Sequence, residues 1–284
     1  MDLPAGTAAD PALAADRLAT RYGLKSWTRA TPAWNETLDV LLGHRSVRRF
    51  LPDALSPGIL ETLVGAAQSA PSSSNLQVWS VVAVEDPERK SRLATLAVDQ
   101  AFIRQAPLFL VWLIDHQKLR SVARTLGQKT EALDYVESLL LGAVDAALAA
   151  QNATVALESL GLGATYVGAI RNRPVQVAAE LALPQHVFPL FGMAIGRPDP
   201  AAGAGVKPRL PQDAVLFREQ YGSGAAQLAA IETYNPRLRA YQRAQGMTEQ
   251  DWTVQATTRT AGPQSMAGRH RLQDFLQELG FPLL

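Results

Sequence analysis

The sequence lacks the residues and motifs that several common chemistries need. It has no cysteine, which excludes disulfides, thiolate metal sites and cysteine nucleophiles. Its four histidines are scattered, and none of them pair at metal-ligand spacing. There is no P-loop, no G-x-S-x-G elbow, no H-x-E motif and no paired-carboxylate motif. If the chain is an enzyme, we therefore expect a cofactor to carry the chemistry, and we expect no metal site.

The chain also lacks a clear excess of positive or negative charge. The chain has 27 Lys and Arg against 26 Asp and Glu, a net charge of +1, so nothing global indicates nucleic acid or an acidic membrane as a partner. The N-terminus has no basic start followed by an apolar run, so we expect no signal peptide. The absence of cysteine fits a reducing compartment. We therefore expect a cytoplasmic location.

Length and composition bound the domain organisation. The 284 residues, 47% of them hydrophobic, suffice for one large core. We expect residues 1–34 to be a flexible or loosely docked extension, in which 11–22 could form a short helix with Leu13, Leu18 and Tyr22 on its apolar face. Residues 35–284 are predicted to form a single domain. Its C-terminal excursion, about 212–284, is too poor in apolar residues for a separate core.

One alanine- and leucine-rich stretch, 138–160, predicts a long helix that ends at Gly161-Leu162-Gly163. Its apolar residues lie nearly all round, which predicts burial on several sides. Asp145, Gln151, Asn152 and Glu158 fall within it, and this number of polar groups argues against a membrane span. We expect this helix to form the core.

Shorter apolar runs predict the remaining elements. The predicted strands are 79–84, 108–114, 164–170 and 188–195. The predicted helices are 36–42, 56–70, 86–98, 172–183, 225–231, 237–244 and 269–279. Ser56 and Asp86, each followed by proline, have the residue types of helix caps. The order of elements indicates an α/β or α+β sheet protein with long helices.

Four segments could carry chemistry, although each is a weak signal by itself. The basic run 44–49 could hold phosphate but is more often a solvated face. The polar run 72–77 could contact a heteroaromatic ring but is more often a plain loop. The glycines of 161–168 have the wrong spacing for a dinucleotide fingerprint and precede a strand, which favours a turn where backbone approaches a flat ligand. The fourth segment is Lys207-Pro208-Arg209.

Six motifs in order give the chain a clear resemblance. They are HRSVR at 44–48, SSSxxQ at 72–77, AAxAAQN at 146–152, ESLGLG at 158–163 followed by YVG at 166–168, LPQHVFPLFG at 183–192, and KPRLP at 207–211. In these the chain resembles the NADPH-dependent nitroreductase and flavin oxidoreductase family, in the branch of the major oxygen-insensitive nitroreductase. The resemblance is close over about 36–221 and loose in the tail. It implies an α+β, nitroreductase-like homodimer with a central mixed or antiparallel sheet flanked by helices, and with the long helix at the dimer interface.

The resemblance also implies a site for FMN. The residues expected to bind FMN are His44, Arg45, Ser46, Val47, Arg48, Ser72, Ser73, Ser74, Gln77, Gln100, Tyr166, Val167, Gly168, Ala169, Lys207 and Arg209. Substrate or NADPH contacts are expected at Asn75, Arg171 and Arg243, the last being the nearest tail arginine. Ala169 stands where the family usually has a second glycine, which is expected to tighten the approach to the flavin slightly.

The implied function is that of an FMN-dependent NAD(P)H oxidoreductase. Two electrons would pass by ping-pong hydride transfer from NADPH through FMN to nitroaromatics, quinones or free flavin. Two alternatives stay open: a dedicated flavin reductase that supplies a partner monooxygenase, and a flavin-binding protein without turnover. The sequence leaves open the physiological acceptor, the preference between NADPH and NADH, and the role of the N-terminal extension.

Overall fold

The computed structural model describes residues 11–23 and 33–284. The chain divides into two compact units. The sheet unit comprises Ser46–Ala202 and Met266–Leu284, and the helical unit comprises the described residues of Met1–Arg45 and Gly203–Ser265.

The sheet unit contains one four-stranded sheet of order β1-β2-β4-β3, in which every pairing is antiparallel. The strands are β1 (Trp79–Val84), β2 (Leu108–Asp115), β3 (Gly163–Val167) and β4 (Val187–Gly196). All four predicted strands and the α+β class are thus confirmed. The third strand is shorter than predicted, because the chain turns into a 3-10 helix, η3 (Gly168–Asn172), before Ile170. Ile170 is buried although it lies in this turn, so its apolar character alone could not distinguish a turn from a strand.

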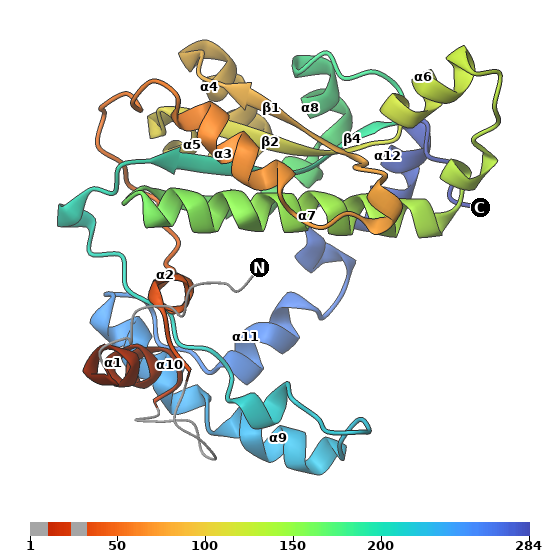
Figure 1. The fold of residues 1–284 in the computed structure, drawn as a ribbon. Coiled ribbons are helices and arrows are strands. Elements are labelled where there is room, and N and C mark those ends of the chain that lie inside the picture. Colours follow the sequence, from red (N-terminus) through yellow and green to blue (C-terminus); the bar gives the residue numbers. More distant parts are fainter. Residues whose placement is uncertain (1–10, 24–32) are drawn as a thin grey trace, which may run out of the picture. The chain divides into compact units, whose positions relative to one another are not determined.

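Side chains of β2 build the core on both faces of the sheet. Phe109, Val111 and Leu113 join one cluster, and Leu108, Leu110 and Trp112 join the other. This alternation follows from the two-residue period of a strand, and burial on both faces explains the unbroken apolar run. Helices α4 (Pro87–Leu96), α5 (Ala101–Gln105) and α8 (Pro174–Glu180) contribute to the first cluster, and α3 (Ile59–Gln68) and α7 (Val136–Ser159) contribute to the second (Figure 1).

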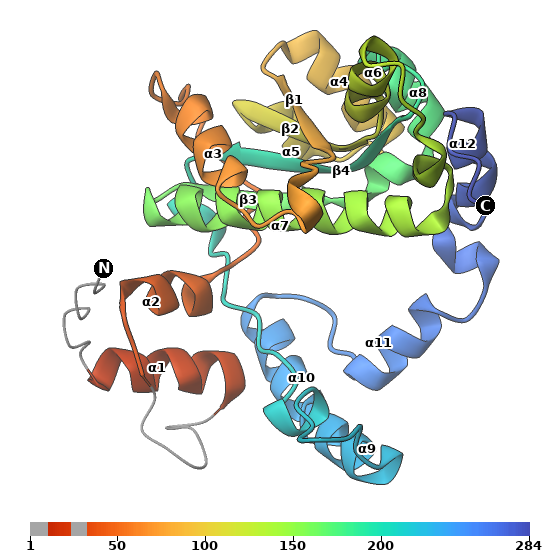
Figure 2. The same ribbon diagram turned by 45° about the vertical axis from the view of Figure 1, so that its right-hand side comes forward.

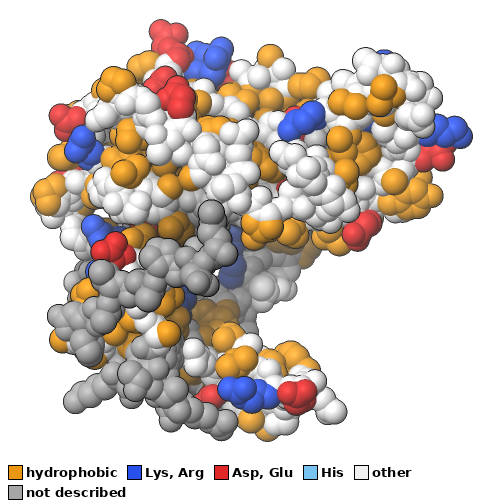
Figure 3. All heavy atoms as spheres, in the orientation of Figure 1, with side chains coloured by type: hydrophobic (Ala, Val, Ile, Leu, Met, Phe, Trp, Pro, Cys, Tyr) orange, Lys and Arg blue, Asp and Glu red, His pale blue; other side chains and the backbone are white. Residues whose placement is uncertain are grey.

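The long helix α7 starts and ends close to its predicted bounds and packs along the sheet beside α3 (Figure 2). Ala146, Ala149 and Ala153 are among its buried residues. Leu140, Val144 and Leu148 are exposed by 57%, 56% and 39%. Among residues 11–23 and 33–284 nothing covers this apolar stripe, so the predicted burial on several sides does not hold there. Apolar side chains reach the surface along α7 in Figure 3. Length and hydropathy alone would allow α7 to span a membrane, but here it is a core helix of the sheet.

Helix starts follow the expected cap chemistry in one case and depart from it in another. Asp86 caps α4 by accepting from Arg89 N at 2.7 Å, as predicted. Helix α3 starts at Ile59, and its cap residue is Gly58 with φ of 84°, so the predicted start at Ser56 is wrong. A left-handed residue at that position suits glycine, which lacks a Cβ.

The C-terminal residues belong to the sheet unit. The predicted helix 269–279 is split into a 3-10 turn, η7 (Arg269–Arg271), and α12 (Leu272–Glu278). Leu276, Leu279 and Phe281 pack with Ile114 and Phe188 in a third cluster. Helix α6 (Gln117–Thr125) of this unit lies in a stretch where no element was predicted.

The helical unit is built from five helices: α1 (Pro11–Tyr22), α2 (Glu36–Gly43), α9 (Gly224–Glu232), α10 (Asn235–Ala244) and α11 (Trp252–Arg259). The helix over 11–22 is confirmed, but its buried face is Ala14, Leu18 and Arg21, while Leu13 is 40% exposed. Positions 14, 18 and 21 are spaced i, i+4 and i+7, which places them on one face. Residues 1–10 and 24–32 of the predicted extension lie outside the described residues.

Candidate cofactor-binding site

The segment His44–Arg48 runs from the end of α2 to the sheet. Ser46 forms a parallel bridge with Ala164, and Val47 N donates to Ala164 O at 2.9 Å. The Val47 side chain is only 3% exposed and belongs to the core, and its N–H is paired with Ala164 O, so it can offer a ligand only its backbone carbonyl. Arg45, Ser46 and Arg48 are exposed, which leaves their side chains accessible.

A buried carboxylate on α7 organises the serine loop. Asp145, 2% exposed, accepts from Ser72 Oγ at 2.7 Å and Val78 N at 3.2 Å through Oδ2, and from Ser73 N at 3.4 Å through Oδ1. Ser72 Oγ in turn accepts from Gln77 N at 2.8 Å. Hydrogen bonds to an ionised acceptor are the stronger kind. This role of Asp145 was not predicted, although a carboxylate within an apolar helix was a signal.

The backbone of the same loop is strained. Ser74, Asn75 and Gln77 have positive φ angles of 48°, 56° and 50°. Each such residue costs about 1–3 kcal/mol and persists only where the surroundings over-determine it. Strain of this kind gathers at ligand sites, and the hydrogen bonds to Asp145 supply the constraint here. The loop is therefore held in one conformation with polar groups at the surface.

The segment Tyr166–Ala169 leaves β3 and is held by α7 as well. The Tyr166 hydroxyl and Thr154 Oγ1 are 3.0 Å apart, and the Tyr166 ring packs on Phe191 with centroids 5.3 Å apart. Burial raises the pKa of Tyr166 above its usual value. The Val167 side chain is 1% exposed, so this residue can offer a ligand only its backbone. Ala169 packs partly against the core, and its predicted effect on the approach to the flavin stays a prediction.

Two arginines lie beside Gly168. A Cβ placed on Gly168 would lie 3.4 Å from Arg171 Nη2 and 3.8 Å from Arg269 Nη1. Burial lowers the pKa of Arg171, and the nearby charge of Arg269 lowers it further. Arg171 donates to Leu190 O, and Arg269 Nε donates to Met266 O at 2.9 Å. Arg269 was not among the predicted site residues, since nothing in its spacing links it to residue 168.

Arg243, the tail arginine offered by the sequence, has a different environment. It lies on α10 in the helical unit and forms an exposed ion pair with Glu249 at 2.8 Å. The ion pair raises the pKa of Arg243, chiefly through the hydrogen bond. Its predicted contact with NADPH stays a prediction.

Gln100 has an unusual buried atom. It immediately precedes α5, and its Oε1 is buried without a hydrogen-bond partner among the described residues. An unpaired buried acceptor is costly, and a ligand N–H group would satisfy it. This environment fits the predicted role in cofactor binding.

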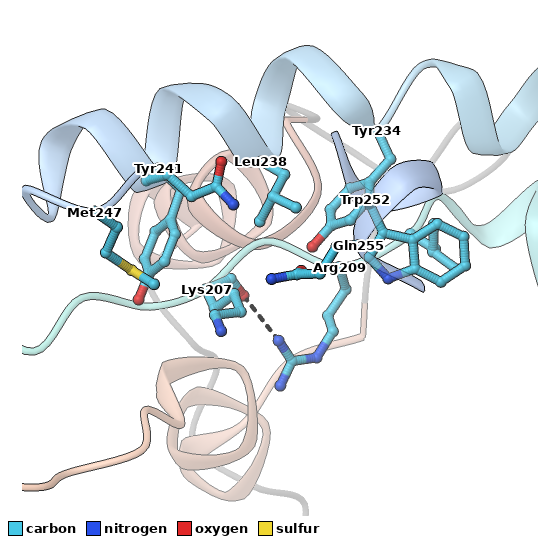
Figure 4. Close-up of a pocket in the computed structure, with 10 residues that line it drawn as sticks. Lys207, Arg209, Tyr234, Leu238, Tyr241, Met247, Trp252 and Gln255 are labelled. Atoms are coloured by element: carbon cyan, nitrogen blue, oxygen red, sulfur yellow. Dashed lines mark hydrogen bonds between the residues drawn. The ribbon is translucent and has the colours of Figure 1, made fainter. Parts of the chain in front are cut away.

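The Lys207–Arg209 segment lies in the helical unit with its backbone held at three successive residues. Lys207 O accepts from Arg21 Nη1 at 2.7 Å, Pro208 O accepts from the Tyr234 hydroxyl at 2.8 Å, and Arg209 N donates to Arg21 O at 2.9 Å. Figure 4 shows the terminal nitrogens of Lys207 and Arg209 on the same side of the segment. Arg209 Nη1 donates to Lys207 O at 3.2 Å, and Lys207 Nζ lies 5.9 Å from the centre of the Tyr241 ring. Both residues contribute to the lining of a cavity of about 310 Å³, together with Tyr234, Tyr241 and Trp252.

Comparison with known proteins identifies the family. The model of the Nitroreductase family matches residues 41–197, and that of the Nitroreductase family, C-terminal domain, matches residues 207–284. The chain belongs to the nitroreductase family. This confirms the resemblance drawn from the six motifs.

The alignments with known relatives cover most of this chain. It is 36% identical over 251 residues to "FMN reductase (NADPH)" of Bacillus subtilis, covering 87% of this chain and 98% of that protein. It is 38% identical over 230 residues to "NADPH-flavin oxidoreductase" of Vibrio harveyi, covering 80% and 92%. Among solved structures, NADPH:FMN oxidoreductase from Vibrio harveyi complexed with NAD+ matches with a TM-score of 0.77 at 35% identity, covering 87% of this chain and 99% of that one. The nitroreductase-like fold is thereby confirmed.

Proposed function

We propose that this protein is an FMN-dependent oxidoreductase that uses NADPH to reduce nitroaromatics, quinones or free flavin. The observation that carries the proposal is the Lys207–Arg209 segment, where two cations project to one side from a backbone held at three successive residues. Fixed cations of this kind suit a phosphate group. The printed names of the relatives, FMN reductase and NADPH-flavin oxidoreductase, support the same chemistry.

The residues fit FMN in kind. Lys207 and Arg209, with the exposed Arg45 and Arg48, supply cations for its phosphate. The serine loop, the backbone of 166–169 and the unpaired Gln100 Oε1 supply polar groups for the ring. When bound, FMN supplies the redox chemistry by accepting a hydride from NADPH and giving two electrons to an acceptor. The residues of the chain bind and orient it, and the proposal assigns no catalytic acid or base.

Arg171 and Arg269 are the best candidates for binding the anionic part of NADPH. They lie together beside Gly168, and their charges act on each other. An anion would relieve that repulsion. The proposal therefore places Arg269 in the role that the sequence analysis gave to Arg243.

The proposal includes a homodimer. Leu140, Val144 and Leu148 form an exposed apolar stripe along α7, with a spacing of four residues that keeps them on one face. A stripe of large apolar side chains on a core helix suits association with a second copy. A cytoplasmic location is also part of the proposal, since NADPH is a reductant of that compartment.

The test is an absorbance spectrum followed by anaerobic titration with NADPH and then NADH. We expect bound flavin whose visible bands bleach with NADPH, and turnover with at least one of the proposed acceptors. Rates across nitroaromatics, quinones and free flavin would separate a broad reductase from a dedicated flavin reductase. Flavin that binds but is reduced by neither nicotinamide would refute the enzyme and favour a flavin-binding protein.

A double variant tests the phosphate contacts. Arg48→Ala with Lys207→Ala should lose FMN while remaining folded, because two cations near the phosphate are removed. The matched control is Arg124→Ala with Lys129→Ala, which removes two exposed cations at and after the end of α6. Full flavin content in the first double variant would contradict the phosphate assignment.

A further inference from the structure

Helix α1 docks on α2 through one face. Ala14 and Leu18 are buried, and Arg17 forms an ion pair with Asp39 of α2 at 2.7 Å. The same face ends with Arg21, which is only 4% exposed. Residues 11–22 precede the part of the chain that the family models match, 41–197 and 207–284. The helix is therefore an addition to the matched region rather than part of it.

Arg21 joins two segments that carry predicted FMN ligands. Its Nη2 donates to Leu42 O at 2.8 Å and to His44 O at 2.6 Å, and its Nη1 donates to Lys207 O at 2.7 Å. Its own carbonyl accepts from Arg209 N at 2.9 Å. One buried guanidinium thus links the backbone before Arg45 to the backbone of Lys207.

Tyr234 completes this arrangement. Its hydroxyl donates to Pro208 O at 2.8 Å, and the residue is 4% exposed. Arg21 and Tyr234 together fix Lys207, Pro208 and Arg209 through buried partners, so the backbone of the segment has little freedom. Lys207 and Arg209 then begin from fixed Cα positions and project to the same side (Figure 4).

We propose that Arg21 is a positioning residue for the phosphate of FMN, acting with Tyr234 as a clamp on the Lys207–Arg209 segment. The inference rests on the proposed function. Positioned cations bind an anion more tightly than mobile ones, since less conformational entropy is lost on binding. The N-terminal helix is thereby part of the cofactor site, although its side chains do not touch the cofactor in this proposal.

A purely structural role is the alternative. Leu42 and His44 lie at the C-terminal end of α2, where a cation stabilises the last carbonyls whether or not a ligand binds. Such a role would affect all ligands of the protein alike. A positioning role for phosphate would affect only ligands that carry phosphate, and this difference decides between the two.

The experiment compares FMN with riboflavin, which has the same ring but no phosphate. Dissociation constants for both are measured with FMN-free protein by quenching of flavin fluorescence. Arg21→Lys keeps the charge but lacks the planar fork that reaches several carbonyls. We expect Arg21→Lys to weaken FMN binding about tenfold, the equivalent of about 1.4 kcal/mol, and riboflavin binding by less than about twofold.

The matched control is Arg17→Lys, the same substitution one turn earlier on α1. It alters the ion pair with Asp39 but no contact to the Lys207–Arg209 segment, so both affinities should stay within about twofold of the wild type. Tyr234→Phe is the second test variant and removes only the hydroxyl that holds Pro208. It should also weaken FMN binding selectively, by roughly threefold to tenfold.

Each outcome is informative. Phosphate-selective loss in Arg21→Lys or Tyr234→Phe supports the clamp. Equal loss for FMN and riboflavin, or no loss in either variant, overturns it and leaves a structural role. If Arg21→Lys does not fold, the result for Tyr234→Phe decides. A wild-type protein that binds neither flavin would refute the proposed function itself, whereas one with normal FMN preference and insensitive variants would refute only this inference.

Discussion

Replacing Asp145 by asparagine should loosen the serine loop and destabilise the sheet unit. The asparagine has nearly the same shape, so the substitution leaves no cavity. It removes the negative charge and turns one acceptor oxygen into an amide donor. In the wild type the carboxylate accepts hydrogen bonds from Ser72 Oγ, Ser73 N and Val78 N. In the variant at least one of these donors would face an N–H group.

The magnitude follows from these contacts. Hydrogen bonds to a charged group contribute about 1.5–3 kcal/mol, and neutral ones about 1 kcal/mol. By these ranges, reducing two bonds to neutral ones and losing a third costs about 2.5–7 kcal/mol of the free energy of unfolding, and we expect the lower end, about 3 kcal/mol. For a chain of this size we expect the melting temperature to fall by roughly 6 °C.

The assay is urea denaturation of FMN-free protein, combined with hydrogen exchange of the amides of Ser73, Gln77 and Val78. These amides should exchange faster in Asp145→Asn, because their acceptors are weakened or moved. The control is Asp53→Asn at an exposed position, which should change stability by less than about 0.5 kcal/mol. A loss below about 0.5 kcal/mol in Asp145→Asn, with unchanged amide exchange, would refute the role given to Asp145.

Three further predictions concern the same unit. Val144→Asp on the exposed stripe should convert the proposed dimer to monomers, as measured by light scattering, and an unchanged mass would exclude this interface. Gly142→Ala should lower stability by about 1–3 kcal/mol in thermal denaturation, because a Cβ there would lie 2.5 Å from Ile114 Cγ2, and an unchanged melting temperature would contradict that packing. Burial lowers the pKa values of His116 and His186 below the ordinary value of 6.5, so the unfolded chain binds more protons as pH falls below that value. Thermal stability should therefore decrease from pH 7 toward pH 5, and a flat profile would oppose the assignment.

The strands and the long helix could be predicted because their signals are local. The apolar run of β2 and the alanine-rich run of α7 each reflect burial against neighbours within the same unit. The turn at Gly168 was missed because Ile170 is as buried in a 3-10 turn as it would be in a strand. Local apolarity reports burial and does not report backbone direction.

The candidate site stays a prediction of the motifs, and the structure adds contacts that the motifs did not indicate. Motifs placed Val47 and Val167 in the site, but both side chains are in the core, so only their backbones are available. Asp145, Arg269 and Arg21 were missed because each acts on residues distant in sequence, such as Ser72 and Gly168. Contacts of this kind depend on how the elements pack, and a single sequence does not show that packing.

Helix α7 has a consequence for how the protein behaves on dilution. One of its faces holds the serine loop through Asp145 and Tyr166 through Thr154, while another carries the stripe around Val144. If a second copy covers that stripe, self-association and cofactor binding would both restrict the motion of α7. Coupling between two binding equilibria is reciprocal, so each would strengthen the other to the same degree. Retention of FMN would then depend on protein concentration, and dilute solutions would lose colour at a concentration set by the self-association of the chain.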